Sequence, residues 1–512
     1  MAIAKPGDII IIDRNCHKSH HYAMVLGGLS PYYIEAYPLK EYSMYGAVPI
    51  IEIKKALLKL KSENKLDRVK VIDLTNCTFD GHVYNVRRVM MECLAIKPDL
   101  VFLWDEAWFG FAHWSPFLRP RTAMGAASHI EDWLKTPEAL DEFKQQQNEL
   151  GNEPSDEKLL STQLIPDPRL VKLRVYQTHS THKSMSSLRQ GSMILAKDVY
   201  YNNIKYQLNE AIFTHSTTSP NQQIIASLDI ARRQMVLEGY QLVSNAIQIA
   251  LNIRYNINNH PLISKYFKIL GADDLIPAEY RKSGFVDFLS SNQNLISSYL
   301  SLANDEFFLD PTRLTLVCGT ANFDGTSFKN LLADKFEIQV NKTSRNSVLL
   351  QSNINNTRSD VAHLLKVLIN ISKEIESALL DDSKKTRFKH NVAELMENVP
   401  DLPNFSHFAE EFRKDVNGNI SVEGDIRTAF FKSWDESNCE YIDILSPECD
   451  ERLANGPEMV SAKLVIPYPP GFPILVPGQV IDKHTIEFMR KLDVKEIHGY
   501  DNDLGLQLII SK

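Results

Sequence analysis

The chain has 512 residues, 44% hydrophobic and 23% charged, so it is long enough for about three folding units. Its 56 basic and 64 acidic side chains give a net charge of −8, which argues against a general nucleic-acid binder. The six cysteines show no C-x-x-C spacing, and no apolar run approaches the roughly 18 residues that span a bilayer. We therefore expect a soluble, cytoplasmic protein that binds neither nucleic acid nor membrane.

The first third of the chain alternates short apolar runs with amphipathic segments. Runs rich in β-branched and aromatic residues predict buried strands at 7–13, 31–37, 69–75, 100–107, 173–180 and 191–198. Segments 50–64 and 84–97, between these runs, are typical of helices. The alternation predicts an α/β fold with a mostly parallel sheet and helices on both faces. Ligands bind beyond the carboxyl ends of such strands, so the polar residues there are candidates for a site.

The rest of the chain is divided by polar stretches. Residues 135–168 are polar and contain several prolines, which fits an exposed excursion that could contain a short helix better than it fits core. Residues 222–254 have sustained helical periodicity and predict one or two long helices, and a proline-broken strand is expected at 460–479. We expect a cofactor-binding large domain, a small α+β domain and a C-terminal domain, at 1–305, 306–395 and 396–512.

The strongest chemical signal is HSTHKSMSSLRQGS, at 179–192. Lys183 follows a predicted strand, where a buried ammonium is costly unless it reaches solvent or has a chemical role. Partial desolvation would lower its pKa, so that the amine could form a Schiff base with an aldehyde cofactor. The neighbouring hydroxyls and imidazole could bind a phosphate group. From this segment alone, a surface loop rich in serine and lysine is an equally good interpretation.

Asp105 is the second signal, because it ends an apolar run in LVFLWDEA at 100–107. An unpaired carboxylate there is strongly disfavoured and needs a cation, which a protonated pyridine nitrogen would supply. Asp105 and Lys183 follow strands that we expect to be close in one sheet. Together they meet the two minimal requirements of pyridoxal phosphate, an acid for the ring nitrogen and an amine for the aldehyde. A metal ligand or a helix cap is the alternative role for Asp105.

His17, in DRNCHKSHH at 13–21, is the third candidate. A flat imidazole at the end of a strand could stack on an aromatic cofactor. Histidines 17, 20 and 21 also suggest zinc, but without a matching carboxylate or cysteine pair this spacing is weak evidence for a metal. We expect no metal, and a surface histidine without a function is commoner than either role.

Seven motifs, in the correct order along the chain, resemble the bacterial ornithine/lysine/arginine decarboxylases. They are DRNCHKSHH, YSMYGAVP, DLTNCTFDGHVYN, WDEAWFGF, STHKSMSSLRQGS, STTSP and IPYPPGFPILVPG. Members of this family are pyridoxal-phosphate enzymes of the aspartate-aminotransferase fold, fold type I. The resemblance implies a lyase of polyamine metabolism that decarboxylates arginine, lysine or ornithine to the amine and CO2. It also implies a homo-oligomer, at least a dimer.

The resemblance assigns roles to single residues as well. Lys183 would hold the cofactor covalently, Asp105 would pair with the pyridine nitrogen, and His17 would stack on the ring. The other implied cofactor contacts are Ala107 on the second ring face, Ser180 and His182 at the phosphate, and Thr217 and Ser219 in a turn that reaches the partner subunit's active site.

The N-terminus departs from the family pattern. Family members carry a wing domain, a linker, and a first strand and helix whose Gly-Thr-Ser-type loop binds the cofactor phosphate. This sequence begins at PGDIIIID, which corresponds to the strand after that loop. We therefore expect a large domain without its first strand and first phosphate loop, which a separately encoded N-terminal chain could complete.

Two other functions stay open at the level of the sequence. One is a truncated or non-catalytic subunit that assembles with a complementary chain. The other is an aminotransferase of the same fold, in which Arg427 could bind the substrate carboxylate. For a basic substrate, Glu440 and Asp443 are candidate acids at the pocket rim, although a solvated face explains their charge better. The loop at 467–473 would shape the mouth of the site.

Overall fold

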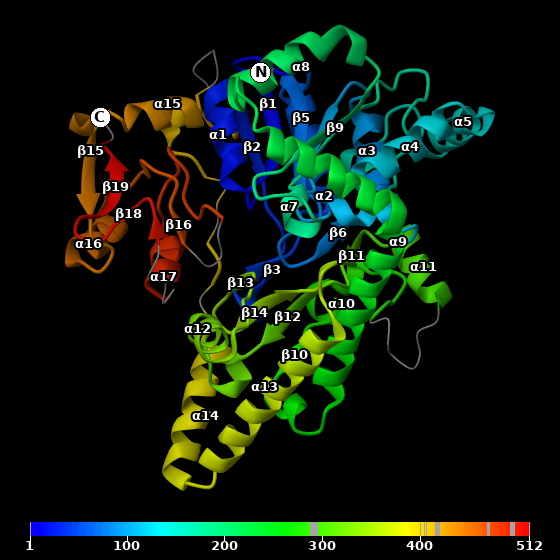
Figure 1. Ribbon diagram of the computed structural model, residues 1–512. Coiled ribbons are helices and arrows are strands. Elements are labelled where there is room, and N and C mark those ends of the chain that lie inside the picture. Colours follow the sequence, from blue (N-terminus) through cyan, green and yellow to red (C-terminus); the bar gives the residue numbers. More distant parts are fainter. Residues whose placement is uncertain are drawn as a thin grey trace.

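Six strands form the central sheet of the computed structural model (Figure 1). In spatial order they are β2 (Ser30–Ile34), β1 (Ile9–Asp13), β5 (Val69–Thr75), β7 (Val101–Asp105), β8 (Arg174–His179) and β9 (Met193–Asp198). The first five run parallel, and β9 is antiparallel to β8. All six coincide with runs predicted from the sequence, so the mostly parallel α/β sheet is confirmed. The structure describes residues 2–286, 295–399, 401–403, 405, 407–414, 420–467, 472–491 and 497–510.

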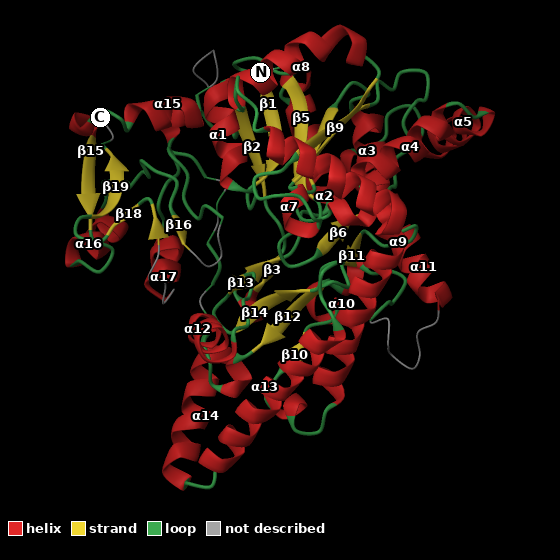
Figure 2. Cartoon of the chain, in the orientation of Figure 1, coloured by secondary structure: helices red, strands yellow, loops and turns green. Residues whose placement is uncertain are grey.

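The inner strands of the sheet are largely buried on both faces, which explains their long apolar runs, whereas the edge strand β9 is only partly buried. In β1, Ile9 and Ile11 belong to one hydrophobic core, while Ile10 and Ile12 belong to another, because side chains alternate along a strand. The first core also takes side chains from α2, α3 and α4, and the second from α1 and the C-terminal part of the chain. Figure 2 shows these helices around the strands. Their bounds are α1 Lys18–Gly27, α2 Ile50–Ser62, α3 Val86–Ile96 and α4 Ala123–Leu134.

The polar stretch 135–168 is more helical than expected. It contains α5 (Pro137–Leu150) and α6 (Asp156–Ser161). Pro137 occupies the first helical position of α5, where a proline costs no hydrogen bond, and only Ala139 and Leu150 of this helix are buried. A proline in this stretch can therefore begin a helix, and it does not only mark a loop.

A single helix, α9 (Gln222–Asn259), follows α8 (Tyr201–His215) and accounts for the long periodic segment. It packs in the core of the central sheet through Met235 and Val243, and in a separate core through Ile249 and Ile257 nearer its C-terminus. That separate core lies on an antiparallel sheet in the order β10-β12-β14-β13. The elements of this unit are β10 Lys268–Ile269, β12 Arg313–Val317, β14 Ser347–Gln351, β13 Lys342–Thr343, α12 Gly325–Phe336, α13 Arg358–Ala378 and α14 Asp382–Met396.

The C-terminal segment packs beside α1 (Figure 1). Its elements are α15 Ile426–Lys432, β15 Cys439–Ile442, α16 Pro447–Asn455, β16 Ile466–Pro467, α17 Lys483–Lys491, β17 Ile497–His498, β18 Tyr500–Asp501 and β19 Gly505–Ile509. The buried Arg14 ties this segment to the end of β1, donating to the carbonyl of Pro473 at 2.7 Å and to Gln479 Oε1 at 3.0 Å. The strand expected at 460–479 is reduced to β16 and isolated bridges, since its prolines lack donors, and 468–471 lie outside the described residues.

Short elements complete the described chain. They are β3 Pro38–Leu39, β4 Met44–Tyr45, β6 His82–Tyr84, α7 Thr181–Ser184, α10 Ala272–Leu275, α11 Leu295–Asn304 and β11 Phe307–Leu309. β11 pairs with β6, so the chain returns to the large unit before it enters β12. No helix within the described ranges is both long and apolar enough to cross a bilayer. The domain boundaries at 305 and 395 stay a prediction.

Candidate active site

A cavity of about 830 Å³ opens where four parallel strands of the central sheet end. Asp13, Thr75, Asp105 and Thr178, at the carboxyl ends of β1, β5, β7 and β8, line it. The last three are neighbours in the strand register. Residues of α1 and of the second sheet close the cavity from other sides. Its place is the one at which α/β sheets bind ligands.

Asp105 is held by three hydrogen bonds. Its Oδ1 accepts from the backbone N–H of Ala107 at 3.0 Å and from Thr178 Oγ1 at 3.1 Å, and its Oδ2 lies 3.1 Å from His20 Nε2. Burial alone would raise the pKa of Asp105, but the hydrogen bond and charge of His20 outweigh it and, with the N–H of Ala107, lower this pKa to about 2. Asp105 is therefore an ionised carboxylate in the cavity wall.

His20 bridges two carboxylates. Its Nδ1 lies 2.6 Å from Asp73 Oδ2, opposite the contact with Asp105, and both acids are largely buried. Burial disfavours the charged ring, but the charge of Asp73 and the hydrogen bonds to both acids raise the pKa of His20 well above 6.5. A protonated ring donates from both nitrogens, so His20 satisfies both acids at once. Asp105 thus has a cationic partner within the protein, which the sequence did not reveal.

Lys183 lies on α7, directly after β8, and also lines the cavity. Its Nζ is 4.6 Å from the ring centre of Trp108, and the guanidinium of Arg313 is 4.8 Å from the same ring centre. Burial lowers the pKa of Lys183; the charge of Asp105 opposes this shift and that of Arg313 adds to it. No carboxylate of a described residue lies within ion-pair distance of Lys183. The amine is thus available to a ligand in the cavity.

Three more of the predicted residues reach the same cavity. His17 caps the N-terminus of α1, where its Nδ1 accepts from the backbone N–H of Ser19 at 3.3 Å. Burial and the charge of Lys183 lower the pKa of His17, which favours its neutral ring. Ala107 and Ser180 line the cavity as well. Five predicted residues therefore meet in one place.

The other predicted residues lie elsewhere. His182 Nδ1 is 2.9 Å from the carbonyl oxygen of Gly191, and this side chain is not among those lining the cavity. Thr217 and Ser219 lie in an exposed turn between α8 and α9, also away from it.

The alternative candidates for substrate recognition also have other partners. Arg427 donates to the carbonyls of Val25 and Leu26 at the end of α1, each at 3.0 Å. Glu440 pairs with Arg452, and neither Glu440 nor Asp443 lines the cavity. Phe472 of the proline-rich loop does line it.

Some residues of the site were not predicted. Asp73 and Thr178 were not singled out, Trp108 appeared only within a motif, and His20 only as a possible metal ligand. A signal for His20 was present, since positions three apart on a helix share a face and His17 was already assigned to the site. Within the described residues, no group of three His, Cys, Asp or Glu side chains could hold a metal ion.

Known proteins are similar to this chain along nearly all of its length. A curated lysine decarboxylase of Hafnia alvei is 24% identical over 546 residues, which cover 97% of this chain and 62% of that protein. A biodegradative arginine decarboxylase of Escherichia coli is 23% identical over 566 residues, covering 98% and 66%. An ornithine decarboxylase of Haemophilus influenzae is 23% identical, covering 93% and 64%. The chain thus spans just under two thirds of the length of these relatives.

Solved structures give the same fold. The constitutive lysine decarboxylase of E. coli superposes with a TM-score of 0.66 at 19% identity, covering 99% of this chain and 68% of that one. The Francisella novicida lysine decarboxylase gives 0.65 at 21% identity, covering 100% and 67%. The expected fold type I is confirmed. The sequence model described as "Orn/Lys/Arg decarboxylase, major domain" matches residues 1–135 and 161–360. The chain therefore belongs to the Orn/Lys/Arg decarboxylase family.

Proposed function

We propose that this chain is a pyridoxal-phosphate-dependent decarboxylase that converts arginine, lysine or ornithine to the amine and CO2. The observation that carries the proposal is that Asp105 and Lys183 line one cavity, at the ends of two neighbouring parallel strands. Family membership supports the same reaction. Curated relatives named for each of the three substrates match comparably well, so the substrate class is proposed rather than one amino acid.

The cavity fits the cofactor in size and chemistry. Its volume of about 830 Å³ lies in the range of small-molecule sites. Asp105 offers an ionised acid for a protonated ring nitrogen, and Lys183 offers an amine for the aldehyde carbon. His17 and Ala107 would lie on the two faces of the ring, and the hydroxyl of Ser180 would bind the phosphate. The buried hydroxyl of Thr75 also lines the cavity and has no hydrogen-bond partner among the described residues, so it could bind a ligand oxygen.

When bound, pyridoxal phosphate supplies an electron sink for the negative charge that departing CO2 leaves on Cα. The chain's own residues prepare the site for this chemistry. Asp105, with its pKa of about 2, keeps a full negative charge where the ring nitrogen would carry a proton. His20 fixes the orientation of that carboxylate. The lowered pKa of Lys183 increases the fraction of free amine near neutral pH, which is the reactive form.

We also propose that the chain self-associates, at least as a dimer. The long helix α9 exposes large apolar side chains, among them Ile230 at 66%, Leu237 at 82% and Tyr240 at 64%. Such a strip on a monomer's surface is typical of a protein interface. The exposed turn with Thr217 and Ser219 lies at the start of the same helix. Light scattering on the purified chain tests this point. A cytoplasmic location is part of the proposal, supported by six cysteines that are all free thiols.

The reaction is tested by incubating the purified chain with pyridoxal phosphate and reducing it with borohydride. We expect a cofactor-sized mass increase on the peptide that contains Lys183. CO2 release with lysine, ornithine and arginine, and transamination with 2-oxoglutarate, are measured on a separate sample that has not been reduced, because borohydride inactivates the cofactor. Lys183→Ala should lose both the mass increase and CO2 release, whereas Lys205→Ala, an exposed lysine on α8, should lose neither. A mass increase at other lysines only, or transamination without CO2, would refute the proposal.

A further inference from the structure

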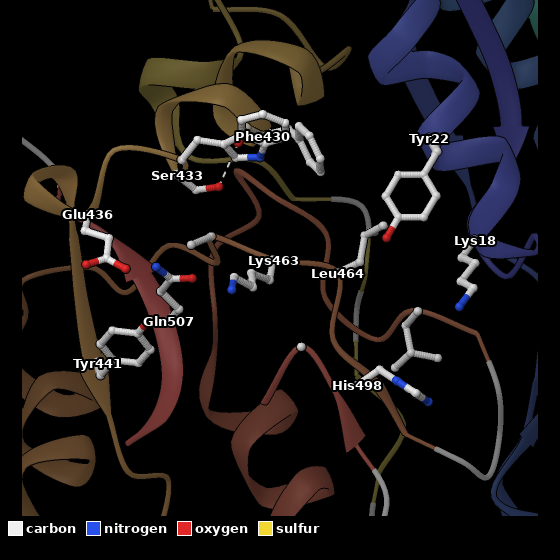
Figure 3. Close-up of a pocket in the computed structure, with 14 residues that line it drawn as sticks. Lys18, Tyr22, Phe430, Ser433, Glu436, Tyr441, Lys463, Leu464, His498 and Gln507 are labelled. Carbon is white, nitrogen blue, oxygen red and sulfur yellow. Dashed lines mark hydrogen bonds between the residues drawn. The ribbon is translucent and has the colours of Figure 1, made fainter. Parts of the chain in front are cut away.

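A second cavity, of about 490 Å³, lies between α1 and the C-terminal segment (Figure 3). The first helix forms a wall of both cavities. Lys18 and Tyr22 of α1 line the second cavity, whereas His17 and His20 line the candidate active site. The second cavity is therefore separate from the site of the proposed reaction, although the same helix bounds it.

The far wall of this cavity contains an unsatisfied buried acceptor. Gln507, on β19, is only 5% exposed, yet its Oε1 accepts no hydrogen bond from any described residue. In Figure 3 its amide group points into the cavity. A buried acceptor without a donor costs roughly 1–3 kcal/mol, so a ligand that donates an N–H to this oxygen would recover that loss. Gln507 thus indicates that an N–H donor of a ligand would bind at the wall formed by β19.

Three charged side chains line the cavity. Glu436 lies on the same side as Gln507, Lys463 lies near the centre, and Lys18 lies on the wall formed by α1 (Figure 3). In the part of the chain that the structure describes, none of these three charges has an ion-pair partner within 4 Å. The cavity therefore offers two acceptors, a carboxylate and an amide oxygen, and separately two ammonium donors.

Aromatic rings form much of the remaining wall. Tyr22 contacts Phe430 edge-on, with 6.2 Å between ring centres, and Phe430 contacts Trp434 at 5.7 Å. Trp434 is 69% exposed, so its ring offers open apolar surface at the cavity. These rings suit the apolar body of a small molecule rather than a highly charged one.

We propose that this second cavity binds a free amino acid. Its ammonium group would donate to Gln507 Oε1 and Glu436, its carboxylate would pair with Lys463, and its side chain would lie along Phe430 and Trp434. A basic amino acid and an apolar one share this chemistry, and the experiment separates the two. The proposal concerns binding at a second site and does not depend on the decarboxylase activity.

The test is calorimetric titration of the full chain, with L-phenylalanine and L-lysine as probes. Phenethylamine and 3-phenylpropionate serve as probes that carry only the ammonium or only the carboxylate. We expect saturable binding of at least one amino acid, with both single-charge probes at least about tenfold weaker. If L-lysine binds more tightly, and the variants described below weaken its binding, the ligand of the cavity is a basic amino acid. If L-phenylalanine binds more tightly, the ligand is an apolar amino acid.

Variants locate the binding. Lys463→Gln, on an exposed side chain, and Gln507→Leu, on a buried one, should each weaken binding by about tenfold or more. Lys483→Gln, which removes an exposed lysine of α17 in the same segment, is the matched control and should leave binding unchanged. Should Gln507→Leu fail to fold, Lys463→Gln alone decides. No binding of either amino acid at millimolar concentration, equal binding of a single-charge probe, or binding that Lys463→Gln leaves intact would overturn the proposal.

Discussion

Replacing His20 by glutamine should destabilise the protein strongly and in a pH-dependent way. His20 contacts Asp73 at 2.6 Å and Asp105 at 3.1 Å, and it is about one-tenth exposed. A glutamine amide is neutral, so two buried carboxylates would face each other without a cation between them. Breaking a buried ion pair from one side costs about 3–5 kcal/mol, and we expect a loss of that size in the free energy of unfolding at pH 6.

The pH dependence follows from the raised pKa of His20. Stabilisation by a group whose pKa rises on folding is fully present below its unfolded value, near 6.5, and is lost as the pH rises through the folded value. The difference between wild type and His20→Gln should therefore be larger at pH 6 than at pH 10. Urea unfolding at both pH values measures it, with His129→Gln, an exposed histidine on α4, as the control. A loss below about 1 kcal/mol at pH 6, or one that does not change with pH, would refute the assignment of His20 as an imidazolium bridge.

Three more outcomes can be measured on the same protein. Glu92→Gln should cost about 3–5 kcal/mol in urea unfolding, because it leaves the buried ammonium of Lys54, now 2.6 Å from Glu92, without a carboxylate. The double variant Lys54→Met, Glu92→Leu removes both charges and should restore most of this loss. Asp13→Asn should stabilise the chain by roughly 2–3 kcal/mol at pH 8 and not at pH 4. Burial raises the pKa of Asp13 from 3.8 to about 6, so its ionisation at pH 8 destabilises the folded state. Equal effects of the substitution at both pH values would contradict this reasoning. Trp108→Leu removes the ring that both Lys183 and the guanidinium of Arg313 contact. The pKa of Lys183 should therefore fall further, by roughly half a unit to one unit, as read from the pH profile of its labelling by an amine reagent.

The central sheet could be predicted because its inner strands are largely buried on both faces. The four isoleucines at 9–12 leave no polar position open to water, so apolar continuity marks such an inner strand. The adjacency of Asp105 and Lys183 followed from the same alternation, since consecutive βα units place their strand ends together. The periodicity of residues 222–254 predicted one or two long helices, and the structure has one, α9.

The contacts of His20 with Asp73 and Asp105 could not be predicted in the same way. His20 and Asp73 are 53 positions apart, and their contact depends on how the first turn of α1 lies over the end of β5. A sequence shows that Asp105 needs a cation but not which side chain reaches it. The second cavity is also a product of tertiary packing, because its walls come from α1 and from segments more than 400 positions later.

The continuity of α9 limits how the two halves of the molecule can move. Because one uninterrupted helix contributes side chains to both hydrophobic cores, a rotation of the second sheet against the first must either bend this helix or pull residues out of a core. Bending stiffness along 38 residues makes a freely swinging hinge at this junction costly. The packing of α9 in both cores therefore fixes the width of the cavity between the strand ends and Lys342 of the second sheet, without any contribution from a bound ligand.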